Sequence, residues 1–132
     1  MIAQIILNKD YKKEADFQKD ICLLLDSAIA KNNLIYYFSV PNGVILGGKN
    51  SFALMKMLKN TGFKSGVSDL ILIFKDCILF LELKLDNNKL SKEQENFKKI
   101  VSQGVNYHYL TITPTKELDI LFKLLGVPKC KY

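Results

Sequence analysis

The chain has 132 residues, enough for one compact domain, and we expect residues 1–132 to form a single domain. Hydrophobic residues make up 48% of it, so it can bury a core, yet no apolar run approaches the roughly 20 residues that cross a bilayer. The net charge is +6, from 19 lysines against 13 acidic residues, and the chain contains no arginine. That balance suits a polyanionic partner and excludes the bidentate guanidinium contacts that read guanine.

The first half of the chain is expected to alternate between extended and helical segments. Residues 1–7 form a short apolar stretch that we interpret as an edge strand. Between residues 12 and 31 apolar side chains recur at helical spacing with charge on the other face, which predicts a helix. Residues 34–40 predict a strand that ends at a Pro-Asn-Gly turn, and Ser51 is placed to cap a helix that runs to about residue 59.

The second half contains two neighbouring apolar runs, residues 69–74 and 77–85. A capping box at residues 91–94 predicts a helix to about residue 103, which is followed by a strand at 106–111 and a last helix at 114–125. We therefore expect an α/β fold (α+β with one mixed sheet) in the order α-β-α-β-β-α-β-α. Helices should cover both faces of the sheet, because the two runs are apolar on both faces.

The two apolar runs predict a β-hairpin whose loop is Lys75-Asp76. A two-residue loop pairs residues whose numbers sum to 151, so Asp69 should lie opposite Glu82, and a four-residue loop keeps this pairing. A three-residue loop would break it. Lys84 shares the face of Glu82 because side chains alternate along a strand. Two carboxylates and one ammonium group should thus meet at one end of the hairpin.

Such a pair of acids in apolar strands needs compensation, because like charges repel and burial removes their hydration. Lys84 can neutralise one charge, whereas a divalent cation compensates both. Oxygen ligands of this kind suit Mg²⁺, for which Mn²⁺ can substitute. The alternative is a salt bridge between Glu82 and Lys84 at the strand end, with Asp69 capping the preceding loop.

The motif Gly66-Val67-Ser68-Asp69 followed by Glu82-Leu83-Lys84 resembles the signature of the PD-(D/E)XK nucleases, with Ser68 in place of the usual proline. Further motifs resemble the virus-type replication-repair nuclease (VRR-NUC) family. They are residues 14–18, 41–43, 59–66, 90–94 and Phe97, and the likeness spans residues 14 to about 110. The resemblance implies a restriction-endonuclease-like core and a magnesium-dependent endonuclease activity.

The resemblance also implies roles for individual residues. Asp69 and Glu82 would bind the metal together with the backbone carbonyl of Leu83, and Lys84 would orient or deprotonate the attacking water. Glu14 would reach the metal directly or through water, although an acid in the first turn of a helix is also favoured by the helix dipole. Gln94 would lie beside the site, although the capping box alone explains it.

DNA is the expected partner. We expect Lys49, Lys64, Ser68 and Lys92 to contact it, and Lys56, Lys59, Lys98 and Lys99 can extend a phosphate track or be ordinary exposed lysines. Short stand-alone VRR-NUC proteins resemble viral or phage enzymes that dimerise and cut branched DNA, which implies a homodimer acting on four-way (Holliday) junctions. A repair or flap nuclease without junction preference, and a nuclease fold that binds without cutting, are the alternatives.

Two other motifs indicate different chemistry. Residues 43–50 come within one residue of a phosphate-binding P-loop, but Asn50 stands where Ser or Thr must hold Mg²⁺, so we expect no nucleotide cofactor. His108 is a candidate base, but a lone histidine in a strand is more often packed or exposed. The N-terminus lacks a secretory signal and the three cysteines form no CxxC pair, so we expect a cytoplasmic protein with no membrane partner.

Overall fold

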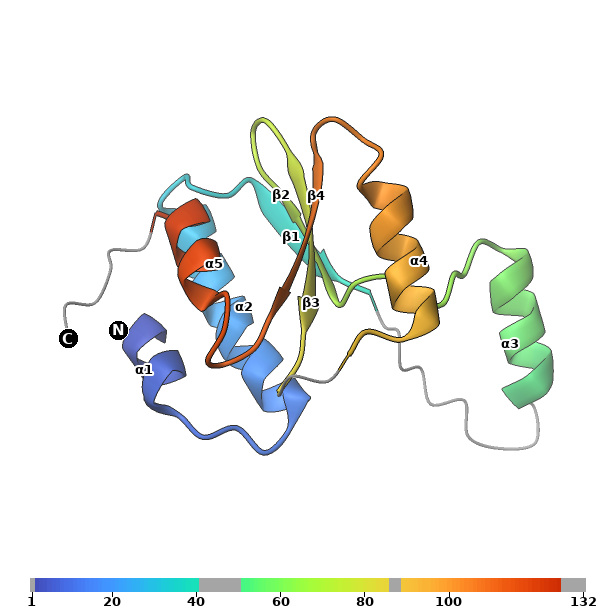
Figure 1. The fold of residues 1–132 in the computed structure, drawn as a ribbon, viewed down its shortest axis with the longest axis horizontal. Helices are drawn as coiled ribbons and strands as arrows, with labels where there is room; N and C mark the ends of the chain where they lie inside the picture. Colours follow the sequence, from blue (N-terminus) through green and yellow to red (C-terminus); the bar gives the residue numbers. More distant parts are fainter. Residues whose placement is uncertain (1, 41–50, 86–88, 127–132) are drawn as a thin grey trace.

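The computed structural model describes residues 2–40, 51–85 and 89–126, and these form five helices and a four-stranded mixed sheet. The elements follow one another along the chain as drawn in Figure 1. Their bounds are α1 (Ile2–Asn8), α2 (Glu14–Ala30), β1 (Tyr36–Ser39), α3 (Ser51–Asn60), β2 (Leu70–Ile73), β3 (Ile78–Leu83), α4 (Lys92–Val101), β4 (Tyr107–Ile112) and α5 (Leu118–Leu124). A mixed sheet in an α+β fold is therefore confirmed.

The strands lie in the order β1-β2-β3-β4. β1 with β2 and β2 with β3 are antiparallel, whereas β3 and β4 are parallel and are connected by α4. In the β2–β3 hairpin every paired residue number sums to 151, from Ile73 with Ile78 to Leu70 with Leu81. The backbone N–H of Phe74 donates to the carbonyl of Cys77 at 2.9 Å, which closes the loop at Lys75-Asp76 as predicted.

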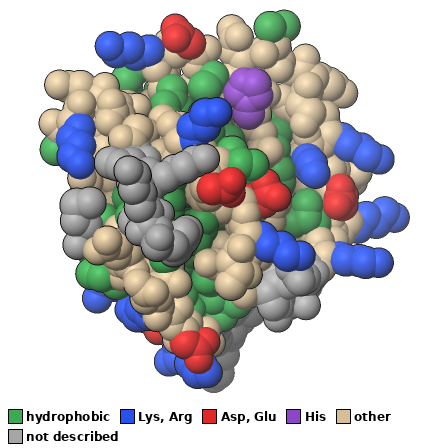
Figure 2. Space-filling view, turned by 60° about the vertical axis from the view of Figure 1, so that its left-hand side comes forward, with side chains coloured by type: hydrophobic (Ala, Val, Ile, Leu, Met, Phe, Trp, Pro, Cys, Tyr) green, Lys and Arg blue, Asp and Glu red, His purple; other side chains and the backbone are tan. Residues whose placement is uncertain are grey.

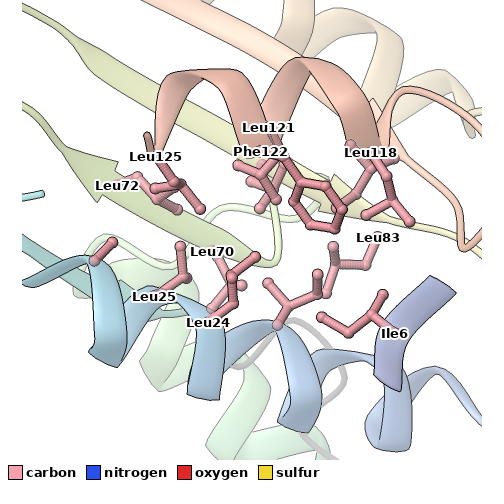
Figure 3. Packing of buried hydrophobic residues seen from close by; sticks show 14 of the residues in the cluster. Ile6, Leu24, Leu25, Leu70, Leu72, Leu83, Leu118, Leu121, Phe122 and Leu125 are labelled. Atoms are coloured by element: carbon pink, nitrogen blue, oxygen red, sulfur yellow. The ribbon is translucent and has the colours of Figure 1, made fainter. Parts of the chain in front are cut away.

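The two faces of the sheet are covered by different helices. In Figure 1, α1, α2 and α5 lie on one side of the sheet and α4 lies on the other. Leucines of β2 and β3 fill the first side, and Figure 3 shows Leu70, Leu72 and Leu83 between α2 and α5. On the α4 side the contact is aromatic, because the Phe80 ring of β3 meets the Phe97 ring of α4 edge-on with centroids 5.3 Å apart.

The two helices that position the candidate site form for clear reasons. α2 buries Phe17, Ile21, Leu24, Leu25 and Ala28, which recur at helical spacing on the face turned to the sheet. α4 begins with the predicted capping box, in which Ser91 Oγ accepts from the Gln94 N–H and Gln94 Oε1 accepts from the Ser91 N–H. These two reciprocal hydrogen bonds fix the first turn of α4.

The expected strand at residues 1–7 is wrong, because residues 2–8 form α1. Ala3 and Ile6 are three residues apart, so a helix places both on one face, and both are buried against the core beside α2. The last helix begins at Leu118 and not at Pro114, because Thr113 Oγ1 accepts from the N–H of Lys116 and holds residues 113–116 in a turn. None of the helices in the described residues is both long and apolar enough to cross a membrane.

Candidate active site

Asp69 and Glu82 lie at the end of the hairpin that is remote from its loop. The last ladder pair is Leu70 with Leu81, so Asp69, directly before β2, stands opposite Glu82 in β3. Asp69 Oδ2 accepts a hydrogen bond from the backbone N–H of Leu83 at 2.8 Å, which holds this carboxylate against β3. The two carboxyl groups are close enough to share a hydrogen bond when one is protonated. The structure therefore brings both acids to the same face of the sheet.

Glu82 is buried, and only one of its two carboxylate oxygens accepts a hydrogen bond from the described residues. The residue is 3% exposed, and its Oε1 accepts a hydrogen bond from Gln94 Nε2 at 2.9 Å. Its Oε2 is buried as well, and no donor in the described part of the chain reaches it. A buried carboxylate oxygen without a partner is costly and calls for a specific explanation, such as a bound ion or water.

The surroundings of the two acids favour their protonated forms. Burial raises the pKa of Glu82 to about 8, and the Asp69 carboxylate adds to this effect, whereas Lys84 opposes it. Burial also raises the pKa of Asp69, against the hydrogen bond from Leu83 and the charge of Lys84. The pair therefore tends to retain a proton, because Lys84 and the other described residues supply too little positive charge to keep both acids ionised.

Lys84 reaches the site through Gln94. Its Nζ donates to Gln94 Oε1 at 3.3 Å, and the same Gln94 side chain donates to Glu82. Among the described residues no ion pair joins Lys84 to Glu82, so the expected alternative of a strand-end salt bridge is wrong. Gln94 thus both caps α4 and ties the Lys84 ammonium to the Glu82 carboxylate.

A cleft of about 270 Å³ opens over the two acids. It lies between the loop before β2 and the first turn of α4, and its lining includes Ser65, Gly66, Ser91 and Gln94. Gly66 has a φ of +82°, and a Cβ there would come within 2.6 Å of the Glu93 backbone. The loop can therefore approach α4 this closely only with glycine at this position.

Two further residues bear on the acids electrostatically. The negative charge of Glu14, the first residue of α2, adds a small contribution to the raised pKa of Glu82. Tyr109 in β4 was not expected in the site, yet burial first, then the charge of Glu82, raises the pKa of its phenol. The Tyr109 hydroxyl is buried without a well-placed hydrogen-bond partner in the described residues, although the nearby Thr111 side chain partly offsets the rise in its pKa. Only the pairing of β3 with β4 reveals this neighbour.

The expected DNA contacts are distributed unevenly. Lys64 and Lys92 are exposed and adjoin the cleft-lining residues Ser65 and Ser91. Ser68 is fully buried and its hydroxyl donates to the carbonyl of Leu70 at 3.2 Å, so it shapes the loop and is not presented to a DNA strand. Lys49 lies outside the described residues. Figure 2 shows lysine side chains spread over one face of the molecule and not gathered in one block.

The other candidate base, His108, does not join the site. His108 is exposed and alternates with Tyr107 and Tyr109 along β4, so it points away from the face that carries Glu82. The P-loop-like segment, residues 43–50, falls outside the described residues. The free thiols of Cys22 and Cys77 are half-buried, so neither is a fully buried core residue.

The two carboxyl groups fit a cation that prefers oxygen ligands, provided that ligands other than acidic side chains complete its coordination shell. Within residues 2–40, 51–85 and 89–126 no three Asp, Glu, His or Cys side chains form a group that could hold a metal ion. Asp69 and Glu82 would therefore need a backbone carbonyl, water or phosphate to complete the shell, which is how Mg²⁺ is usually held. The unpartnered Glu82 Oε2 is the atom that such a cation would satisfy.

Comparison with known proteins adds no relative: no protein-family model, no curated protein and no solved structure matches this chain.

Proposed function

We propose that this protein is a DNA endonuclease that depends on a divalent cation and has a VRR-NUC-like, restriction-endonuclease-like core. The observation that supports this most directly is the pair of facing carboxyl groups, one of which carries a buried oxygen without a donor. A nearby lysine could relieve that cost, but Lys84 donates its hydrogen bond to Gln94 and makes no ion pair with either acid. Two facing carboxyl groups in the lining of a cleft, with one buried oxygen left unpartnered, fit a site completed by a ligand.

Each residue would then have a defined task. Asp69 and Glu82 would hold Mg²⁺, or Mn²⁺ in its place, together with the Leu83 carbonyl, and Glu14 would act through water. When bound, such a cation polarises the scissile phosphate and lowers the pKa of a water molecule. Lys84 would orient that water or help to deprotonate it. Gln94 would keep the Lys84 ammonium at a fixed position relative to Glu82, because one amide contacts both groups.

The substrate is proposed to be branched DNA, with four-way junctions as the leading example, cut by a homodimer in the cytoplasm. This follows from the resemblance to short VRR-NUC proteins. The absence of arginine supports recognition of shape and backbone over base sequence, because lysine meets phosphate as a point charge and offers no planar fork for guanine.

Cleavage of labelled junctions, flaps and blunt duplexes in Mg²⁺ or Mn²⁺ tests the proposal. The wild type should cut, and Asp69→Asn or Glu82→Gln should lower the rate by at least about a hundredfold while DNA binding persists. Glu95→Gln is the matched control, since Glu95 is an exposed acid of α4 outside the cleft lining. A wild type that binds DNA but never cuts would replace the proposal with a non-cleaving binding module, and cutting of flaps alone would replace the junction preference.

A further inference from the structure

Helix α3 is rich in apolar residues, but none of its described side chains is fully buried. Six of its ten residues are apolar, namely Phe52, Ala53, Leu54, Met55, Met57 and Leu58, and all of these side chains are partly or fully exposed. Phe52 is 87% exposed. Figure 1 shows α3 standing apart from the sheet, beyond α4. Exposed apolar surface concentrated on one element marks an interaction site, and the fold itself supplies no partner for it in the described residues.

The charge around α3 has one sign. Residues 27–68 contain five lysines and neither aspartate nor glutamate, so this segment carries +5 of the net charge of +6. On α3 itself Phe52, Lys56 and Lys59 follow one another at spacings of four and three residues. That spacing places them along one face of the helix, and all three are exposed. The helix therefore presents an aromatic ring and two ammonium groups together.

The position of α3 links it to the cleft. Only nine residues separate Lys59 from Asp69, and the loop between them forms part of the cleft wall. Gly66 in this loop packs directly on the backbone of Glu93 in α4. A DNA strand bound along α3 would therefore lie close to the loop that lines the cleft, and through it close to the two acids.

The chemistry of this face selects one occupant. Lysines favour phosphate, and an exposed aromatic ring among lysines favours bases that are free to stack on it. A paired duplex hides its bases in the stack, so it would leave Phe52 without a partner. A second copy of α3 would oppose lysine to lysine, because no acid in residues 27–68 is present to pair with them.

We propose that the face of α3 formed by Phe52, Lys56 and Lys59 is a docking surface for unpaired nucleotides of a DNA strand. The inference rests on the proposed function in that it specifies which part of a branched substrate the nuclease holds. Branched DNA exposes unstacked bases at the branch point, and this surface would recognise them without reading their sequence.

Binding in EDTA tests this without any cleavage. A fluorescent oligothymidylate and a blunt duplex of equal length are titrated with wild type, Phe52→Ala and the control Val105→Ala, whose side chain is 91% exposed and lies outside α3. Phe52→Ala should weaken oligothymidylate binding by about tenfold and leave duplex binding unchanged, because one base–ring stack is lost. Lys56→Gln should weaken the binding of both ligands and reduce the slope of log affinity against log salt concentration by about 1.

The contrary outcomes are equally specific. Equal oligothymidylate affinity for wild type and Phe52→Ala, or an equal loss on both ligands, would overturn the proposal. So would a wild-type dimer in sedimentation that Phe52→Ala converts to monomer without a change in DNA affinity, because α3 would then hold a second copy. If Phe52→Ala selectively loses oligothymidylate binding and the wild type never cuts DNA, the docking surface on α3 is supported and the nuclease function is rejected.

Discussion

Two buried acids of this protein, Asp20 and Glu82, are treated in opposite ways by the fold. Asp20 in α2 is 7% exposed and accepts hydrogen bonds from the Tyr11 hydroxyl at 2.7 Å and from Lys9 Nζ at 3.1 Å. Burial opposes its ionisation, but these two donors outweigh burial and lower the pKa of Asp20. Glu82 has one donor on Oε1, none on Oε2 and a second acid opposite it, and its pKa is raised to about 8.

Burial alone therefore does not mark a functional acid. Both residues lose hydration, but only the Asp20 carboxylate recovers its cost from the chain itself. The described residues leave the burial of Glu82 uncompensated, and for this reason the comparison supports the proposed binding role for Glu82 and a structural role for Asp20. Sites adapted to bind or react commonly sacrifice stability in this way.

The largest expected effect is on stability, which should change in opposite directions when the Asp20 and the Glu82 carboxyl groups are each replaced by an amide. In EDTA at neutral pH, Asp20→Asn should lower the free energy of unfolding by about 2 kcal/mol, because two hydrogen bonds to a charged group are weakened. Glu82→Gln should raise it by about 1 kcal/mol, because the folded chain no longer has to hold a proton on this acid above its unfolded pKa. Urea unfolding measures both. A destabilised Glu82→Gln would mean that the fold already compensates this acid.

The pH dependence should separate the same two residues. The unfolded chain releases the Glu82 proton near pH 4.5, whereas the folded chain holds it to about pH 8, so this acid lowers the stability as pH rises between those values. Asp20 has a lowered pKa, so its contribution is present above its unfolded pKa of 3.8 and is lost as pH falls below that value. Unfolding curves from pH 3 to 9 in EDTA, compared with those of Glu82→Gln and Asp20→Asn, measure both slopes.

Added cation sharpens this test. If the proposed function holds, millimolar Mg²⁺ at pH 8 should restore stability to the wild type, because it binds the folded form. Glu82→Gln should gain much less, whereas Asp20→Asn should gain as much as the wild type. Equal gains in all three proteins would place the cation elsewhere.

The hairpin was predictable because its register depends on a short-range feature. Once Lys75-Asp76 is the loop, every pair in the ladder follows, including the juxtaposition of Asp69 and Glu82. The start of α4 was predictable for the same reason, since a capping box involves four consecutive residues. The facing acids and the start of α4 therefore follow from residues that are close together in the sequence.

The remaining parts depend on packing between distant segments. Five of the seven residues of α1 are apolar, and their spacing fits either a strand or a helix until Ala3 and Ile6 pack against the core. Tyr109 enters the site only because β4 pairs with β3 in a parallel register that places it beside Phe80, and a parallel crossover leaves that register unspecified in sequence. The contacts of Gln94 with Lys84 and Glu82 likewise require α4 to dock on the sheet.

The smallest expected effect concerns the Tyr109 hydroxyl, the other buried polar atom without a partner in the described residues. Tyr109→Phe keeps the ring that packs against Phe97, with centroids 6.2 Å apart, and removes only the unsatisfied hydroxyl. The free energy of unfolding in EDTA should therefore rise by about 1 kcal/mol, because an unpaired buried donor is costly. Tyr107→Phe on the same face of β4 is the control, since its exposed side chain should leave stability unchanged. A loss of stability in Tyr109→Phe would show instead that Thr111 or a buried water satisfies the hydroxyl, so that Tyr109, like Asp20, is a buried group whose cost the protein already compensates.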